Sequence, residues 1–459
     1  MSGVKLKRSL SFISMIALAS GAVLGGWLVE VGYMISVTGP GCILVFPILA
    51  IMLIPVGLVF AELSAMLPFS SAVDVWTTNA FGPKVGWAAQ WLMFLIQVVE
   101  PPMMAFIFTT VIGFFIPIPQ NMVLWVAIAI VAAWYVLSNL NISLTGNLAT
   151  IFFFSMIAIT LVVGITLFTS GHWSFSNLTN HGGWFPKGGG AVFMAFAVFS
   201  LKFIGFEMTP TLAEETNFPM RKMYLIILSA LFIPAATYTF IMLAIGGSAP
   251  WTEIATMTMA EPELIAKFGL PAVIGTLAII AGLLHAITTL MGFWTSSARV
   301  LYGAAQLNQL PKVFKKTNKY GQPIVSNFAV LCFSIFFCFF TGENWIQYIY
   351  SVSCVAAGLV YLICCVDAYA LRKQHPEWAR PYKAPGGTAL LIVGMIVSVW
   401  IVIGSAFALP IGGYISLAIY FLIGLAIYMG MAVYRSNDIQ NRDFIMLTPD
   451  DIEGLGLDA

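Results

Sequence analysis

Five ionisable side chains lie deep inside long apolar segments of the chain: Glu30, Glu100, Lys202, Glu207 and His285. Removing a charge from water is costly, so groups of this kind inside apolar segments pair with one another, bind a ligand or carry protons. The residue types present are suited to ion pairing, to recognition of an amine by carboxylates, and to proton transfer.

Lys202 and Glu207 flank Gly205 in the stretch FSLKFIGFEMTP. Lys202 either pairs with a carboxylate and fixes helix packing, or replaces a bound cation or meets a substrate carboxylate. Glu207 either accepts a hydrogen bond from backbone that the glycine frees, or takes part in a proton-coupled step. Glu100 precedes two prolines that kink a helix and free carbonyl groups. Its carboxylate either selects a substrate amine or neutralises Lys202.

Glu30 follows a glycine-rich stretch, and we expect it in an external vestibule. His285 is expected to be a packed, hydrogen-bonded histidine, with a proton-transfer role as the alternative. Near the predicted helix ends, Glu62, Arg299 and Asp367 are candidates for gate salt bridges or for anchors at the membrane interface.

The composition indicates the class of protein. Of the 459 residues, 60% are hydrophobic and 8% are charged, and the mean hydropathy is +0.94. A soluble domain of this length needs far more charge on its surface, so an integral membrane protein is expected. The net charge of +1 argues against a nucleic-acid partner. The six cysteines lie in apolar segments without metal-ligand spacing, and we predict no metal or cofactor.

The apolar segments predict an all-α membrane protein. A hydrocarbon layer of about 30 Å takes roughly 20 helical residues. We expect the basic, apolar start of the chain to be an uncleaved first span rather than a cleaved signal peptide. The twelve predicted spans cover residues 11–36, 40–66, 85–116, 122–139, 147–169, 190–213, 223–247, 270–298, 324–341, 345–370, 388–409 and 412–434.

Twelve spans place both ends of the chain on one side of the membrane. Of the 20 lysines and arginines, 17 lie in the tails and loops of that side, two lie in the opposite loops, and Lys202 lies within a span. By the positive-inside rule, the N- and C-termini are therefore predicted to be cytoplasmic.

Glycines would interrupt two of the predicted spans. In the first, Gly21 and Gly25 lie four residues apart, with Gly26 adjoining. This spacing fits either small-residue helix packing or a helix break over residues 20–26. In the sixth, Gly205 lies between two aromatic residues, and backbone outside a helix at membrane depth must line a cavity or be buried in protein. Each span is the first in a block of five, and matched interruptions in two halves are typical of inverted-repeat secondary transporters.

The sequence shows no motif for another mechanism of transport or for catalysis. No phosphate loop of the GxxxxGK[ST] type occurs, which argues against ATP-driven pumping by this chain. No HExxH helix or cysteine–histidine cluster indicates a catalytic metal, and no enzyme activity is predicted. An ion channel or a non-transporting receptor on the same scaffold is a rival, although no repeated filter motif or charged ring occurs.

Several stretches, taken together and in order, resemble one known family. They are SGAVLGG in the first span, IPVGLVFAELSAMLP and NAFGPKVGWAAQW around the second and third, FIGFE and EETNFPMRK in the sixth, FWTSSARVLYGAAQLNQLPKVFKKTNKYGQPI at the eighth, and ARPYKAPGG before the eleventh. The family is the amino acid–polyamine–organocation (APC) transporters, and the resemblance covers nearly the whole chain. Within it, the second-span and eighth-span stretches look nearest to bacterial exchangers of the glutamate/GABA or arginine/agmatine type.

The resemblance implies a LeuT-like fold and a backbone site for substrate. The fold would be a five-plus-five inverted repeat with broken helices one and six, plus two C-terminal helices, and it would work by alternating access with exchange or proton coupling. Backbone N–H groups at Ala22, Gly25 and Gly26 would hold a substrate carboxylate, which the helix dipole favours. Carbonyls near Phe203 and Gly205 would receive the amino group.

The resemblance also implies roles for side chains. Phe206 and Trp294 would be aromatic walls or gates, and Glu207 would respond to protons or gate the site. The substrate side chain would meet the third, sixth, eighth and tenth spans, at positions that include Met93, Gln97, Glu100, Ser351 and Ser353.

Two features depart from the family pattern. The usual Gly-Ser-Gly of the first span is Gly25-Gly26-Trp27 here, so an indole stands where the last glycine is expected and puts the shape of the carboxylate site in doubt. The fifth span has no lysine, whereas some relatives carry a fixed cation there.

The sequence thus predicts a secondary active transporter of an amino acid or related amine, with a polyamine or other organocation permease as the alternative. Residues 1–10 and 435–459 would be cytoplasmic tails, 11–370 the transport core with repeats at 11–169 and 190–370, and 388–434 the last two helices. We expect a monomer or homodimer in the bilayer of the inner membrane, with protons as an additional partner. Glu207, Lys202, Glu30 and Trp27 are the candidate coupling or gating residues.

Overall fold

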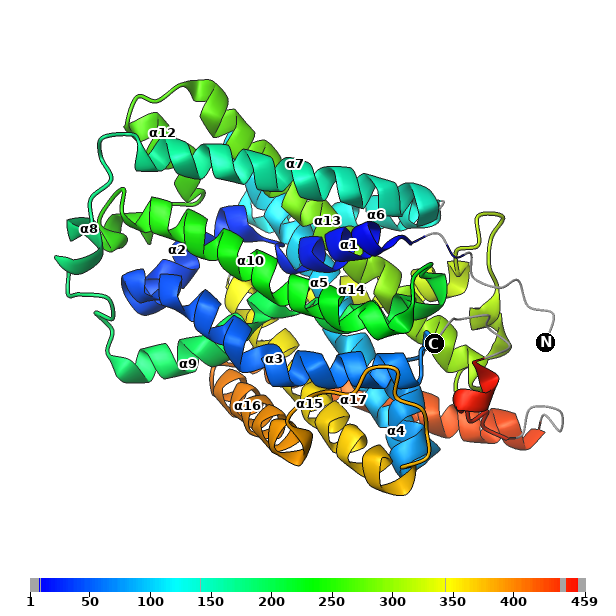
Figure 1. The fold of residues 1–459 in the computed structure, drawn as a ribbon. Helices are drawn as coiled ribbons and strands as arrows, with labels where there is room; N and C mark the ends of the chain where they lie inside the picture. The colour runs from blue at the N-terminus through cyan, green and yellow to red at the C-terminus, as the bar shows by residue number, and fades with distance from the viewer. Residues whose placement is uncertain (1–7, 9, 141, 343, 438–442, 453–459) are drawn as a thin grey trace.

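The computed structural model describes residues 8, 10–140, 142–342, 344–437 and 443–452. Over these ranges the chain is helical and contains no strand, only two isolated β-bridges. Long helices run the length of the molecule, with α8 and α12 at one end and α4 at the other (Figure 1). The prediction of an all-α protein is confirmed.

The α-helices are α1 (Phe12–Val23), α2 (Trp27–Thr38), α3 (Cys42–Met66), α4 (Val73–Phe81), α5 (Pro83–Phe115), α6 (Gln120–Ser138), α7 (Ile142–Phe168), α8 (Ser176–Thr179), α9 (Gly189–Phe199), α10 (Met223–Gly246), α11 (Trp251–Ile254), α12 (Ala260–Lys267), α13 (Ala272–Gln306), α14 (Ile324–Cys338), α15 (Trp345–Gln374), α16 (Gly387–Phe407) and α17 (Ile411–Asn437). Short 3₁₀ helices are η1 (Gly39–Gly41), η2 (Ser200–Phe203), η3 (Phe206–Glu215), η4 (Met220–Lys222), η5 (Lys312–Lys315) and η7 (Pro449–Asp451).

Ten helical stretches of the described chain are long and apolar enough to cross a membrane, counting α2, η1 and α3 as one stretch and α9, η2 and η3 as another. The apolar helices α1 and α14 are shorter. Each of the twelve predicted ranges falls on helix, and the main differences lie at the ends: α13 continues to Gln306, eight residues beyond its predicted end, and α7 begins at Ile142. Leu, Ile, Val and Phe make these segments apolar throughout, whereas helix ends depend on local capping.

The first and sixth predicted spans are both interrupted. Between α1 and α2 the chain turns at Leu24–Gly26, and Gly26 has a left-handed φ of +76°. In the sixth span, α9 gives way to η2, the chain turns at Gly205 with φ of +140°, and η3 follows. Both turning glycines adopt angles that other residues rarely take, so the predicted breaks are confirmed.

The second half of the sixth span remains 3₁₀ to its end. Pro210 has no N–H to donate within this stretch. The hydroxyls of Thr209 and Thr211 donate to carbonyls three residues earlier, at 2.8 and 2.7 Å. These local bonds satisfy carbonyls that a regular α-helix would pair with backbone N–H groups.

Several helices pack against the two halves of the first span. α1 packs against α7, α10 and α13, whereas α2 packs against α9 and the short helices α11 and α12. α13 also contacts α2, so the two halves of the first span share α13 and otherwise have different main partners.

Candidate functional site

At the break between α1 and α2, several backbone carbonyls lack partners within a helix. Side chains from three other elements donate hydrogen bonds to them. These bonds run from Thr289 to the carbonyl of Ala22 (2.9 Å), from Tyr238 to Val23 (2.7 Å), from His285 Nδ1 to Leu24 (2.7 Å) and from Lys202 to Gly25 (2.5 Å). Buried carbonyls require such partners. α10, α13 and η2 thus hold the broken backbone in one shape.

The second break touches the first. A Cβ added at Gly205 would lie 2.8 Å from Val23 Cγ2 and 3.2 Å from the Val23 backbone nitrogen, so only glycine allows this approach. Glu207 accepts a hydrogen bond from the Gly205 N–H at 2.8 Å and lies 3.3 Å from the Tyr361 hydroxyl. Gln97 Nε2 lies 3.5 Å from the other Glu207 oxygen. Glu207 therefore fixes the turn, as one of its two predicted roles required.

Lys202 forms an ion pair with Glu30, not with Glu100. The exposed fractions of the two side chains are 1% and 0%, so the expectation that Glu30 lies in an external vestibule is wrong. α2 carries Glu30 in its first turn, and that turn points the carboxylate back over the break toward η2. The rings of Tyr238 and Tyr350 lie 5.4 and 5.8 Å from the ammonium, where cation–π attraction adds to the pairing.

The predicted side-chain positions of the third and tenth spans separate into two groups. Ser353 of α15 donates to Glu100 Oε1 at 3.0 Å, and Gln97 and Glu100 of α5 are both buried. Ser351 instead donates to the Ala408 carbonyl beyond α16, at 3.2 Å. Residues two positions apart on a helix point to different sides. Ser353 therefore faces the acidic residues, whereas Ser351 does not.

The predicted aromatic residues also differ in position. Phe206 stacks on Tyr361 at 5.3 Å beside the second break. Trp294 donates its indole N–H to Asn327 of α14 at 3.2 Å. Trp294 lies nine residues after His285, which is about two and a half helical turns. The Trp294 side chain therefore lies on the face of α13 opposite His285 and Thr289. The structure therefore does not place the Trp294 indole at the breaks.

Trp27 and Phe203 are both buried. The Trp27 indole packs against the Tyr238 ring at 5.0 Å and donates its N–H to Glu261 of α12 at 2.8 Å. Trp27 thus ties α2 to α12.

Several buried polar atoms around the breaks have no hydrogen-bond partner within the described ranges. They are Ser20 Oγ, Gln97 Oε1, Glu30 Oε1 and His285 Nε2. Buried polar atoms without partners are unfavourable in a finished core and are typical of places that bind a polar group. Within the same ranges no group of three or more histidine, cysteine, aspartate or glutamate side chains is placed to hold a metal ion.

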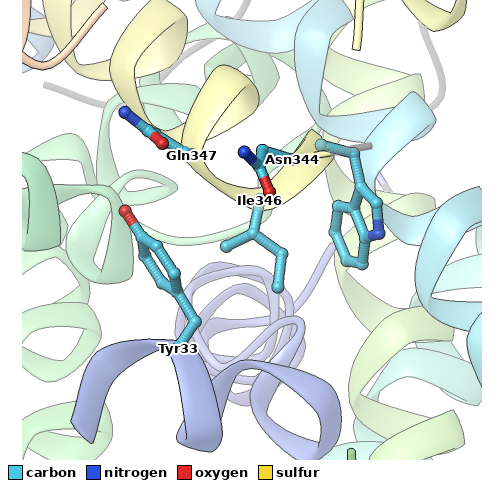
Figure 2. A pocket seen from close by; sticks show the side chains of 5 residues that line it. Tyr33, Asn344, Ile346 and Gln347 are labelled. Atoms are coloured by element: carbon cyan, nitrogen blue, oxygen red, sulfur yellow. The ribbon is translucent and has the colours of Figure 1, made fainter. Parts of the chain in front are cut away.

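A hollow of about 170 Å³ lies beyond the Lys202–Glu30 pair, between Tyr33 of α2 and the start of α15. Figure 2 shows Tyr33 on one side of it and Asn344, Ile346 and Gln347 on the other. The Tyr33 ring lies 5.6 Å from Tyr350, which itself lies beside Lys202. A layer of aromatic rings therefore separates the hollow from the ion pair.

Away from the hollow, salt bridges join helices to one another. Arg299 of α13 donates to Glu215 at 2.6 Å, and both side chains are 1% exposed. Arg372 of α15 pairs with Glu62 of α3, while Asp367 accepts from the Thr77 hydroxyl. Glu62, Arg299 and Asp367 were candidates for gate salt bridges or for membrane-interface anchors. Their contacts join one helix to another, which fits the first role better than the second.

Glu261 gives a prediction outside the apolar spans. Burial raises the pKa of its carboxyl from 4.5 to about 7, against the lowering effect of the Trp27 hydrogen bond. Between these two values the folded protein holds a proton that the unfolded chain has lost, so stability falls as the pH rises from about 4.5 to 7. The loss amounts to about 3 kcal/mol, at about 1.4 kcal/mol for each pKa unit.

We expect Glu261→Gln to gain stability over the wild type across that pH window, and the gain to level off above pH 7. Glutamine still accepts the Trp27 N–H and carries no charge. Thermal unfolding of both proteins in detergent at a series of pH values checks this. Glu253→Gln, on the exposed side of α11, is the control, and a gap between Glu261→Gln and wild type that does not vary with pH would contradict the prediction.

Sequence reasoning missed four residues at the breaks. Thr288 and Thr289 stand beside His285 in the run HAITT, and a polar run inside an apolar span was a usable signal. Tyr238 and Tyr361 lie among other tyrosines in spans seven and ten, and nothing in the sequence distinguishes them from packing residues. Their hydroxyl contacts appear only once helices distant in sequence are brought together.

Comparison with known proteins agrees with this architecture. A family model described as amino acid permease matches residues 13–443. The chain is 26% identical to the gamma-aminobutyric acid permease of Bacillus subtilis (strain 168), over 86% of this chain and 88% of that protein. It is 28% identical to the D-serine/D-alanine/glycine transporter of Escherichia coli (strain K12), over 87% of this chain and 88% of that protein.

Proposed function

The chain belongs to the amino acid permease family, whose members are transporters and not enzymes, and from this we propose that it carries an amino acid or related amine across the inner membrane by alternating access. The supporting observation is the meeting of two broken helices at Val23 and Gly205, with charged side chains buried around them. Broken helices at membrane depth are the usual means by which transporters present backbone groups to substrate.

The proposed topology has twelve spans with both termini in the cytoplasm. α1 with α2, and α9 with η2 and η3, are the broken first and sixth spans. Residues 11–169 and 190–370 form the two inverted repeats, 388–434 the last two helices, and 1–10 and 435–459 the tails.

The backbone of the breaks would read the parts that all amino acids share. N–H groups of the first turn of a helix have no partner within that helix, so those near Gly25 and Gly26 suit a carboxylate. Carbonyls near Phe203 and Gly205 suit an ammonium group, and the aromatic ring of Phe206 would cover the bound molecule.

The substrate's side chain would enter the group formed by Gln97, Glu100, Ser353 and Glu207. Lys202 is already paired with Glu30, and in the described part of the chain no basic side chain forms an ion pair with Glu100 or Glu207. Two carboxylates without a cationic partner favour either an amine on the substrate or protons. The same observation supports the alternative of a polyamine or other organocation permease, and it supports exchange or proton coupling without choosing between them.

A counterflow screen tests the proposed function. Purified protein in liposomes loaded with each common amino acid, or with each decarboxylated amine, is tested at two pH values for accelerated entry of the same labelled compound. Transport by alternating access predicts acceleration by at least one of them. Ion currents far above carrier turnover, without any such acceleration, would indicate a channel instead, and no response to any compound would overturn the proposal.

Glu100→Gln separates the two substrate classes. If the carboxylate receives an amine on the substrate side chain, we expect uptake of cationic substrates to fall by about tenfold to 100-fold, the loss of one charged hydrogen bond, while neutral amino acids are still carried. Glutamine can still accept the Ser353 hydroxyl. Uptake assays with lysine, agmatine and alanine measure this, with Glu263→Gln outside the spans as control. Equal losses for all three substrates would contradict a selective role for Glu100.

A further inference from the structure

The Lys202–Glu30 pair lies on the same backbone that the proposed function assigns to the substrate. The Lys202 ammonium donates to the Gly25 carbonyl at 2.5 Å. The Glu30 carboxylate lies over the turn at Gly26, where an added Cβ would fall on its oxygens. One ammonium and one carboxylate thus contact adjoining residues of the first break.

This pair matches the charges of a zwitterionic amino acid. The carboxylate stands at the N-terminus of α2, where the helix dipole stabilises negative charge, and the ammonium stands on a carbonyl of the break. Both side chains are almost completely buried, and neither Glu30 Oε1 nor the neighbouring Tyr350 hydroxyl has a hydrogen bond of good geometry among the residues described. A pair retained only for packing would be expected to have all its polar atoms satisfied.

We infer that Lys202 and Glu30 form a resident ion pair that competes with the substrate for the first break: the Glu30 carboxylate takes the place of the substrate carboxylate beside Gly26, while Lys202 holds the Gly25 carbonyl and anchors Glu30 there. Substrate binding then requires this pair to move off Gly25 and Gly26, and the apparent affinity is reduced by the fraction of molecules in which the pair holds the break. The inference depends on the proposed function, because it concerns the same backbone site.

The double variant Lys202→Met/Glu30→Gln tests the competition. Single variants leave a buried charge without its partner and lose stability for that reason alone, whereas removing both charges with side chains of similar size avoids this. Labelled glycine and labelled γ-aminobutyrate serve as probes, because each carries one amino and one carboxylate group and no other charge. We expect the double variant to bind at least one of them with a Kd about tenfold or more below that of the wild type.

A matched control removes another lysine–glutamate pair. Lys267 of α12 and Glu253 of α11 pair at 2.5 Å on the surface, with exposed fractions of 46% and 37%. Lys267→Met/Glu253→Gln should leave both affinities unchanged. A resident pair that acts only in packing predicts instead that the Lys202→Met/Glu30→Gln variant binds equally or more weakly, and this result would overturn the inference.

A second variant keeps both charges. Glu30→Asp shortens the side chain by one methylene and withdraws the carboxylate from Gly26, so probe affinity should rise several-fold without loss of the ion-pair charges. Unchanged or weaker affinity in Glu30→Asp would also count against competition. If the wild type exchanges no compound in the counterflow screen, the proposed function itself fails. If it does exchange but neither variant binds more tightly, only the resident-pair inference fails.

Discussion

Glutamine at position 207 is expected to remove the pH dependence of uptake while leaving the second break intact. Glu207 accepts the Gly205 N–H at 2.8 Å and lies within reach of the Tyr361 hydroxyl and the Gln97 amide. The glutamine carbonyl can accept the same N–H, so the turn keeps its hydrogen bond. Glutamine cannot take up and release a proton, so any proton response carried by this position is lost. Uptake into liposomes measured between pH 5.5 and 8 compares the variant with the wild type.

Glu207→Ala is the companion variant. It leaves the buried Gly205 N–H without an acceptor, so uptake should fall by about tenfold to 100-fold at every pH, the cost of one lost charged hydrogen bond. The two variants therefore separate the positioning role of Glu207 from its proton role. A wild-type pH profile in Glu207→Gln would exclude the proton role and leave the positioning role standing.

Breaking the Arg299–Glu215 pair is expected to have the largest effect on stability. Both side chains are 1% exposed, and the Glu215 backbone carbonyl also accepts the Leu10 N–H, which ties the start of α1 to the end of η3. Glu215→Gln removes the carboxylate that contacts the buried Arg299 guanidinium. Losing one partner of a buried pair costs about 3–5 kcal/mol. Thermal unfolding in detergent should show a large drop in Tm.

The double variant Arg299→Met/Glu215→Gln should recover much of that loss, because an uncharged replacement of a buried pair is often close to neutral. Lys267→Met, which breaks an exposed pair, should cost no more than about 1 kcal/mol. If Glu215→Gln is no less stable than Lys267→Met, the Arg299–Glu215 pair does not hold this end of the molecule together.

Particular residues show how far sequence reasoning reached at the site. Gly26 and Gly205 were identifiable because no other residue type adopts such angles without strain inside a buried segment. Glu100, Lys202 and Glu207 were identifiable because a charge among apolar residues needs a reason. The partners were not identifiable: pairing of Lys202 with Glu100 was one of two open alternatives, and in the structure Lys202 pairs with Glu30.

Trp294 and Ser351 illustrate the same limit. Each lies in a span that borders the breaks, but its contacts turn it toward α14 or to the end of α16. Which face of a helix meets the site depends on how that helix is rotated in the bundle. Ser351 and Ser353 are the same residue type two positions apart, so residue type alone does not show which of the two faces the site.

The amino-acid sequence by itself determined that this protein is helical and apolar along its spans, and where two of those spans must break. Hydrophobic length, glycine and isolated charges are local properties that act whatever surrounds them. Only the tertiary structure decided which charges meet, because Glu30 and Lys202 are 172 residues apart and their contact exists only when α2 and η2 lie side by side. The burial of both groups makes that contact decisive, since neither could remain charged in the core without the other.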